Sequence, residues 1–394
     1  MRRGGWFVFP LVVLLVLSTV TFTVLGCTGA KEEAKKEAKE ESATEEKKAS
    51  EGAKSPQDEL MEQVRKEGSK LYIYDWAEWW PEEIYSGFSK EYGIEIVRDN
   101  FADMDEMFTK FKLQPDVEYD LTLPEVRVFM QMKQLGLIQE LRRDWMPNVN
   151  QYLLDNLNDN SFDPGCHYSV PTELYFSGYC YNSRYVDEKD PRIGSWALLY
   201  EGKEYAGRIT MLDDMYNVIG GALKYLGYSW SSDDEEELMK AKEVVLRQKP
   251  WVMAYDSWPK RLVLEEQAVI AHTWVGEAWH FHQELDAIRG VMPKEGGEMG
   301  SDLLVIPKGA RHPAAAHLFM DYVFRPEVNA LLIETVGYAP AHKAVPELLP
   351  EEMKAWPGVT PSEEVFSKYE FVQPKAFTGK GLELRTKIWE ELKQ

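Results

Sequence analysis

The stretch Leu71-Tyr-Ile-Tyr-Asp-Trp-Ala-Glu-Trp-Trp-Pro81 decides the fold, because it joins a strand pattern to a helix start. The apolar residues from Leu71 to Tyr74 predict a strand. Pro81 and the two glutamates after it are typical of the first turn of a helix. A second strand is predicted over residues 94–97, so the folded part of the chain opens with a βαβ unit.

The turn between this strand and its helix carries Trp76, Glu78, Trp79 and Trp80. In open α/β sheets, ligands bind at the carboxyl ends of the strands, which is where this turn lies. Aromatic faces and a carboxylate at that place favour a cationic ligand.

Residues 1–26 have the pattern of an export signal. Two arginines near the start precede an apolar run from Trp6 to Leu25, and Gly26 and Cys27 follow it. A cysteine directly after a small residue resembles a bacterial lipoprotein signal, with Cys27 as the lipidated residue. The alternative is an uncleaved membrane anchor, because the run is long enough to span a bilayer. Both interpretations predict an extracytoplasmic, periplasmic or cell-surface protein held at a membrane.

Residues 27–67 are predicted to be a charged tether. Within them, residues 31–54 are nearly all Lys, Glu, Ala and Ser, a composition that cannot bury a core. The whole chain has a net charge of −21, which argues against nucleic acid and anionic lipid as partners and tolerates cationic small molecules.

Cys166 and Cys180 are the remaining cysteines. An even pair in an oxidising compartment is able to form a disulfide, and these two would face each other if their strands paired antiparallel. The alternative is a pair of buried thiols, and the sequence leaves both open.

Strand patterns alternate with helix patterns along the rest of the chain, which predicts an α/β fold with mostly parallel sheets. A body of this length suggests two domains. The predicted strands are 71–74, 94–97, 119–123, 168–170, 178–181, 208–211, 252–255, 268–273, 290–292 and 303–306. The predicted helices are 82–92, 104–112, 126–135, 214–226, 233–247, 276–288, 313–323 and 327–336.

Motifs for reactive chemistry are missing from the sequence. It has no glycine-rich dinucleotide or phosphate loop and no nucleophile elbow. His280 and His282 stand two apart on a predicted helix and so do not face each other, and His272 is predicted to be a core histidine. We therefore predict no catalytic residue, no metal and no cofactor. In contrast, Asp214, Trp274 and Glu277 follow predicted strands, as the first aromatic turn does, which predicts one convergent binding site.

From about residue 70 to the end, the sequence resembles the periplasmic spermidine/putrescine-binding proteins of bacterial polyamine ABC importers. The matching stretches are LYIYDWAE (71–78), YDLTLP (119–124), YSVP (168–171), LGYS (226–229), PKEGG (293–297), RPEV (325–328) and ETVGYAP (334–340). The resemblance implies two α/β lobes of the periplasmic-binding-protein fold with the ligand in the cleft between them. It also places lobe 1 at residues 68–178 and 302–346, and lobe 2 at residues 179–301 and 347–394.

The resemblance also implies which residues contact the ligand. They are Trp76, Glu78, Trp79, Asp214, Trp274, Glu277, Asp302, Tyr338 and Gln373. Four positions depart from the family pattern: a serine is Glu125, a tyrosine is Arg127, a glutamate is Asn217 and a tryptophan is Gly300. We expect Glu125 to replace the acid lost at position 217. Arg127 would repel a polyamine unless Glu125 neutralises it.

Three functions remain open at the level of the sequence. The first is a solute-binding lipoprotein that delivers a polyamine to the permease subunits of an ABC importer. The second keeps the fold but binds an amino acid or opine-like zwitterion, with Arg127 clamping its carboxylate. The third is an extracytoplasmic carbohydrate-active enzyme that uses acids and aromatic residues.

Overall fold

The computed structural model of the chain describes residues 54–77 and 79–394, and the part from Pro56 to Gln394 is one compact unit. The predictions for the export signal, for Cys27 and for Glu78 lie outside the described residues. Among the described residues, no helix combines the length and apolar character needed to cross a bilayer.

The first sheet contains the opening βαβ unit. Its strand order is β2 (Glu95–Phe101), β1 (Lys70–Trp76) and β3 (Leu121–Thr122), and all its neighbours are parallel. Helix α3 (Glu82–Tyr92) connects β1 to β2, as the sequence predicts. It begins after Pro81 and ends at Gly93, whose φ of 66° is a left-handed conformation that glycine adopts without strain.

The second sheet is mixed, whereas the sequence predicts mostly parallel pairing. Its order is β10 (Met299–Gly300), β5 (Glu173–Asn182), β8 (Ile270–Trp274), β6 (Ile209–Met211) and β7 (Val252–Tyr255), and β9 (Ile288–Val291) and β12 (Ala339–Pro340) also pair with β5. Every partner of β5 runs antiparallel to it, and β6 is parallel to both of its neighbours. Strand β4 (Val170–Pro171), which directly precedes β5 in the sequence, forms a separate two-stranded pair with β11 (Leu303–Leu304).

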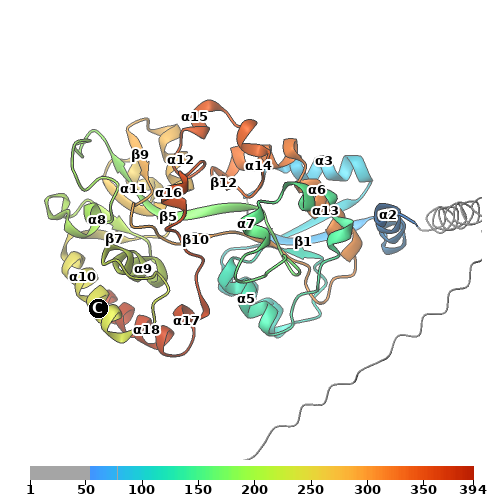
Figure 1. The fold of residues 1–394 in the computed structure, drawn as a ribbon, viewed down its shortest axis with the longest axis horizontal. Helices are drawn as coiled ribbons and strands as arrows, with labels where there is room; N and C mark the ends of the chain where they lie inside the picture. The colour runs from blue at the N-terminus through green and yellow to red at the C-terminus, as the bar shows by residue number, and fades with distance from the viewer. Residues whose placement is uncertain (1–53, 78) are drawn as a thin grey trace, which may run out of the picture. The chain divides into compact units, whose positions relative to one another are not determined.

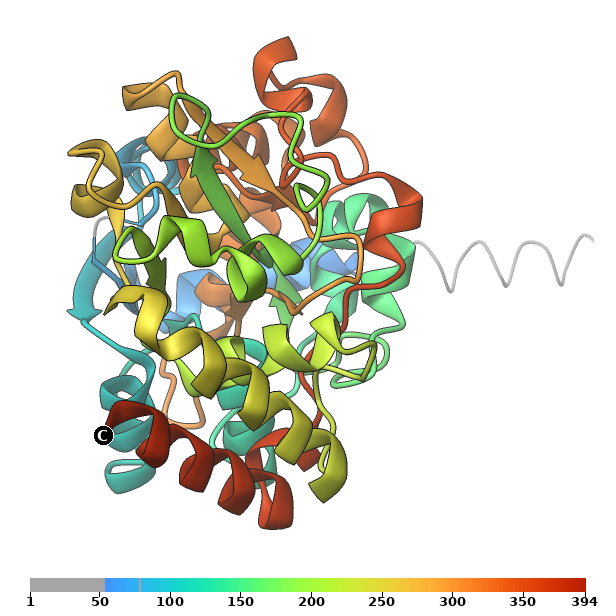
Figure 2. The ribbon, with the colours of Figure 1, turned by 90° about the vertical axis from the view of Figure 1, so that its left-hand side faces the viewer.

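Strand β5 runs between two groups of helices (Figure 1). On one side are α5 (Val126–Gln134), α6 (Pro147–Tyr152), α7 (Asp155–Asn158), α13 (Pro313–Val323) and α14 (Pro326–Val336). On the other are α8 (Ala197–Glu201), α9 (Met215–Tyr225), α10 (Glu235–Gln248), α11 (Lys260–Leu264), α12 (Val275–Glu284) and α18 (Gly379–Lys393). Figure 2 shows α10 and α18 side by side, and both contact α9. The remaining helices are α2 (Pro56–Glu67), α4 (Met104–Leu113), α15 (Glu351–Lys354), α16 (Glu363–Phe366) and α17 (Pro374–Phe377).

Side-chain caps fix the starts of two helices that follow strand ends, α4 and α9. Asp103 accepts a hydrogen bond from the backbone N–H of Glu106 at the start of α4, and Asp214 accepts one from Asn217 at the start of α9. Each cap pairs a backbone donor that the helix itself leaves unpaired. Because these helices begin at the ends of β2 and β6, the caps also fix the direction of the loops around the cleft.

The core of the compact unit forms three clusters of buried apolar side chains. One packs against β6 and the helices α9 and α10, and another packs around Tyr74, Phe101 and the helices α4 and α5. The latter also takes in Val372 and Phe377, from a segment that the sequence assigns to lobe 2. The predicted boundary at residues 178 and 179 falls inside β5, which both sides of the molecule share. The lobe boundaries remain a prediction.

One sequence prediction needs correction, and one question that the sequence left open is decided. Residues 56–67, predicted as tether, form helix α2, which buries Leu60 and Val64 and contacts α13. Most residues of α2 are charged or polar, so its overall composition resembles that of the tether although one face of the helix is apolar. Cys166 and Cys180 are free and buried. Cys180 lies in the middle of β5, while Cys166 contacts the carbonyl oxygen of Leu157, so the alternative of two separate thiols applies.

The packing of α2 yields a stability prediction. Leu60 is 0% exposed, so we expect Leu60→Ala to lower the free energy of unfolding by about 2–5 kcal/mol through lost burial and a residual cavity. The matched control is Leu113→Ala, because Leu113 is 74% exposed and its truncation should change stability by less than about 0.5 kcal/mol. Urea titration measures the free energy of unfolding of both variants. Equal changes in the two would mean that α2 does not unfold together with the rest of the fold.

Candidate binding cleft

A cavity of about 340 Å³ opens where the strands of the first sheet end and face β5 and β8. Its wall consists of Trp76, Ala77, Trp79, Phe101, Ala102, Met104, Glu125, Tyr175, Trp258, Trp274, Asp302 and Tyr338. Trp76 and Phe101 end β1 and β2, and Trp274 ends β8. The cavity therefore has the position that the aromatic turn predicts, at the carboxyl ends of strands.

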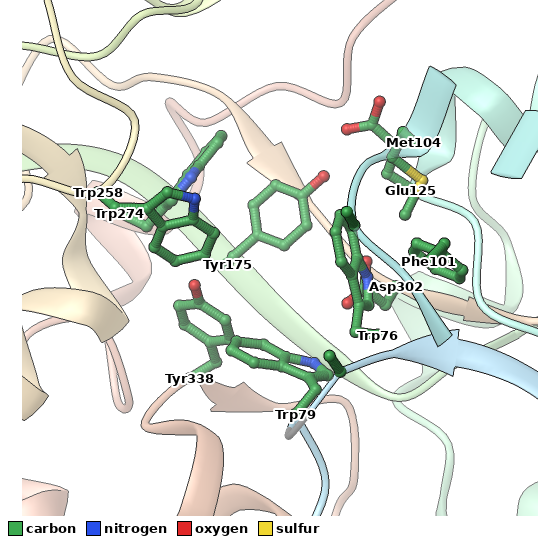
Figure 3. A pocket seen from close by; sticks show the side chains of 12 residues that line it. Trp76, Trp79, Phe101, Met104, Glu125, Tyr175, Trp258, Trp274, Asp302 and Tyr338 are labelled. Atoms are coloured by element: carbon green, nitrogen blue, oxygen red, sulfur yellow. The ribbon is translucent and has the colours of Figure 1, made fainter. Parts of the chain in front are cut away.

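Aromatic rings form most of the wall (Figure 3). Trp76 packs on Phe101 with ring centroids 4.6 Å apart, and Trp79 packs on Tyr338 at 5.5 Å. Such walls suit a flexible methylene chain or a cation, because they offer apolar area and negatively polarised faces.

Tyr175 stands in the middle of the cleft, between Trp76 and Trp274 (Figure 3). Its ring meets that of Trp274 edge to face at 4.8 Å. The ring has room only because position 300 is glycine: a Cβ at Gly300 would lie 2.0 Å from Cζ of Tyr175. The departure at 300 is thus matched by a tyrosine from the neighbouring strand β5, which pairs Gly300 with Tyr175.

One end of the cleft holds a pair of buried acids. Asp302 lines the cavity, and its backbone N–H donates to Oε1 of Glu173 at 3.3 Å. Oε2 of Glu173 is buried and has no hydrogen-bond partner among the described residues. Burial raises the pKa of Glu173 to about 7. Burial, with the Glu173 and Glu125 carboxylates beside it, raises the pKa of Asp302 well above its usual range, and the Trp79 indole opposes that rise.

The other end holds Arg127, Asp214, Asn217 and Glu298, and Glu125, whose backbone bridges to that of Asp302, joins the two groups. Nη2 of Arg127 donates to Oε1 of Glu125 at 2.5 Å, so the two departures at 125 and 127 form an ion pair. Burial raises the pKa of Glu125, and Arg127 opposes the rise. Asn217 donates from Nδ2 to Asp214 and to Glu298, at 3.2 Å in each case.

The predicted binding residues divide into three groups by position. Those in the cavity wall are Trp76, Trp79, Glu125, Trp274, Asp302 and Tyr338. Those adjoining the wall are Arg127, Asp214 and Asn217, through the contacts above, and Glu277, which accepts a hydrogen bond of 3.4 Å from the Tyr338 hydroxyl. Gln373 does not line the cavity: its side chain donates to the carbonyl of Phe371 at 3.0 Å, and its backbone N–H donates to Ser231.

The sequence analysis missed Phe101, Met104, Tyr175 and Trp258 in the wall, and Glu173 and Glu298 beside it. Glu173 and Tyr175 alternate along β5, so both point to one face of the sheet. Glu173 is the only charged residue of β5, and this was the available signal. Phe101 and Trp258 carried no such signal, because single aromatic residues after strands are ordinary core residues.

None of the three histidines discussed from the sequence, His272, His280 and His282, lines the cavity. His272 is 0% exposed, and burial lowers its pKa to about 3, so it is a neutral core histidine as predicted. His280 and His282 on α12 contact different backbone carbonyls, those of Val336 and Ile288. Among the described residues, no group of His, Cys, Asp or Glu side chains has the arrangement of a metal site.

Residues 83–361 match the family of bacterial extracellular solute-binding proteins. The chain belongs to this family. It is 31% identical over 302 residues to the spermidine/putrescine-binding periplasmic protein of Salmonella typhimurium, covering 76% of this chain and 86% of that protein. The corresponding protein of Escherichia coli is 31% identical over 288 residues, or 73% of this chain and 82% of the relative.

Solved structures of solute-binding proteins share the fold. The spermidine/putrescine ABC transporter substrate-binding protein of Streptococcus pneumoniae superposes with a TM-score of 0.76 at 28% identity, covering 83% of this chain and 99% of that one. The TpPotD lipoprotein of Treponema pallidum gives a TM-score of 0.70 at 26% identity over 82% and 99%. This solute-binding protein therefore has the two-lobed α/β fold of periplasmic binding proteins, as the sequence predicts. The family places it outside the cytoplasm as a component that binds solutes for transport.

The contact between Gly300 and Tyr175 predicts a non-additive pair. We expect Gly300→Ala to destabilise the solute-binding protein by about 1–3 kcal/mol, because the new methyl group overlaps the tyrosine ring. In a Tyr175→Ala background the same change should cost less than about 0.5 kcal/mol. A double-mutant cycle by denaturant unfolding measures this coupling. Equal costs in both backgrounds would contradict the overlap.

The raised pKa of Glu173 predicts a pH effect on the ligand-free protein. The ordinary pKa is 4.5, so this carboxyl's contribution to stability is fully present below about pH 4.5 and is lost as the pH rises through about 7. The melting temperature of the wild type should therefore fall more between about pH 5 and pH 8 than that of Glu173→Gln, whose side chain does not titrate. If the melting temperatures of the two proteins fall by the same amount across this range, the pH effect comes from groups other than Glu173.

Proposed function

We propose that this solute-binding protein captures a polyamine of the putrescine or spermidine type and delivers it to the permease subunits of an ABC importer. The observation that carries the proposal is that Asp302 and Glu298 are buried carboxylates with no cationic side chain within ion-pair distance among the described residues. The relatives in Salmonella and Escherichia coli are named for spermidine and putrescine binding, which supports the same ligand class.

The physical argument rests on desolvation. Ammonium groups stay charged at neutral pH, so each needs a carboxylate or an aromatic face when it leaves water. Asp302 supplies the carboxylate, and Trp79 and Trp274 supply faces in the same wall. The methylene chain between the ammonium groups requires only apolar walls. The protein performs no reaction in this proposal, so it is a binding protein and not an enzyme.

We infer further that the protein is tethered to the membrane by a lipid on Cys27. The small residue and cysteine that end the export signal support this, and residues 28–55 are the length of chain available as a spacer before α2. A lipid-anchored binding protein stays close to its permease, which raises the local concentration of the two partners. Mass spectrometry of the amino-terminal peptide from membranes tests the anchor.

The ion pair of Arg127 with Glu125 favours a cationic ligand over a zwitterion. An arginine that already has a carboxylate at 2.5 Å has little affinity left for a ligand carboxylate. With Glu125 beside it, the charge of Arg127 is neutralised, which is the condition for a plain polyamine to bind nearby. The aromatic and acidic wall offers no separate argument for a carbohydrate-active enzyme.

Asp302 provides the direct test of the proposal. We expect Asp302→Asn to lower polyamine affinity by about a hundredfold or more, because an ammonium group would be left buried and unpaired. The ligand-free variant should melt no lower than the wild type, since the change removes a buried carboxyl group. Calorimetric titration with putrescine and spermidine gives both affinities.

The control is Asp286→Asn, because the Asp286 side chain is 91% exposed and lies outside the cleft. Its affinity should equal that of the wild type. Wild-type affinity in Asp302→Asn, or failure of the wild-type protein to bind any polyamine, would contradict the proposed function.

A further inference from the structure

Glu298 is a buried acid at the end of the cleft that contains Arg127. It is 7% exposed, and its side chain accepts a hydrogen bond from Nδ2 of Asn217 at 3.2 Å. Among the described residues, no lysine, arginine or histidine lies within ion-pair distance of it. Burial raises the pKa of Glu298 well above its usual range, the Asp214 and Glu125 carboxylates add to the rise, and Arg127 opposes it only in part.

The charges at this end do not balance. Arg127 opposes the rise in the pKa of Glu298, and it is already engaged by Glu125 at 2.5 Å. Asp214 caps α9, accepting the backbone N–H of Asn217 at 2.7 Å, and none of the described residues places a cation within ion-pair distance of it. Glu298 and Asp214 are therefore in excess of the positive charge nearby. A buried excess of this kind is costly unless a cation joins it.

The hydrogen bonds of Asn217 also indicate that a cationic donor would complete this cluster. Asn217 uses its only side-chain nitrogen on two carboxylates, and its Oδ1 is buried with no hydrogen-bond partner among the described residues. The amide oxygen and the carboxylates are acceptors, so the group that completes the cluster must be a donor. An ammonium group has three donors, one positive charge and no acceptor.

Glu298 and Asp302 lie on one extended segment, and Asp302 lines the cavity. Residues 298, 300 and 302 alternate along it, so their side chains share a face, and the Cα atoms of Glu298 and Asp302 are about 13 Å apart at the rise of a strand. Tyr175 occupies the space over Gly300 between them. The carboxylates of both acids help to raise the pKa of the Tyr175 hydroxyl, so both lie near its ring.

We propose that Glu298 is a binding residue that makes the Arg127 end of the cleft select a cation. The ligand is then a linear molecule with ammonium groups at both ends, one at Asp302 and the other at Glu298, Asp214 and Asn217. A zwitterion with its carboxylate toward Arg127 is rejected, because Glu298 and Asp214 repel it. This inference rests on the proposed polyamine function and adds to it the residue that sets the sign of the charge accepted.

Glu298→Gln separates charge from shape, since glutamine keeps the size of the side chain and removes only its charge. Putrescine and γ-aminobutyrate are suitable probes, because they share a carbon chain and differ in the charge at one end. We expect the variant to bind putrescine and spermidine about tenfold or more weakly, through loss of a charge-assisted hydrogen bond. Its affinity for γ-aminobutyrate should stay the same or rise.

Two further variants make the outcome decisive. Glu390→Gln removes an exposed glutamate on α18 and should leave every affinity unchanged. Adding Asn217→Asp to Glu298→Gln returns a carboxylate to the cluster from α9 and should recover the preference for putrescine. Melting curves without ligand show that each variant folds.

Calorimetry separates the possible results. An equal loss for putrescine and γ-aminobutyrate in Glu298→Gln would mean that the residue acts through shape, and would overturn the inference while leaving the polyamine function intact. Unchanged affinity for both probes would also overturn it. A wild-type protein that binds neither putrescine nor spermidine would overturn the proposed function itself.

Discussion

Strand β5 is the constraint on which the binding cleft depends. All ten of its residues are buried, and it pairs with β8, β9, β10 and β12. Its first half meets the segments that carry Asp302 and Tyr338, and its second half meets the strand that ends at Trp274. A strand held on both sides cannot shift its register without moving every side chain to the other face. Glu173 and Tyr175 are consequently held in the cleft by the most constrained element of the fold.

The same rigidity explains how the protein tolerates buried acids. Folding places the carboxyl groups of Glu173, Glu298 and Asp302 where water is excluded, and burial raises the pKa of each. Burial of the large apolar core around β5 stabilises the fold and offsets the free-energy cost of burying these carboxyl groups. A ligand with ammonium groups would lower those pKa values again, because a nearby cation favours the charged carboxylate. Part of the binding free energy then comes from pairing buried carboxyl groups that lack a cation in the ligand-free protein.

Most of the fold could be predicted from local patterns. Helices α3, α4, α5, α9, α10 and α13 follow apolar periodicity, proline starts and aspartate caps, which act within a few residues of the chain. The prediction failed where tertiary contacts decide. Helix α2 is stable because Leu60 and Val64 pack against the body, and the antiparallel pairing of β5 joins segments far apart in sequence. Cys166 and Cys180 stay unpaired for the same reason, since pairing depends on where their strands end up in space.

By itself, the sequence determined the class of the protein and half of its binding cleft. Local patterns and recognisable stretches identify an exported α/β solute-binding protein. Strand ends locate Trp76 and Trp274, because a turn after a strand is a local property, and the resemblance to the family locates Asp302. Only the tertiary structure decided that Glu125 is consumed by Arg127, that Tyr175 fills the space left by Gly300, and that Glu298 is left without a cation. The contacts of Tyr175 with Gly300 and of Glu298 with Asn217 join residues distant in the chain, and the energies of all three arrangements depend on separation and burial, which no local pattern of residues encodes.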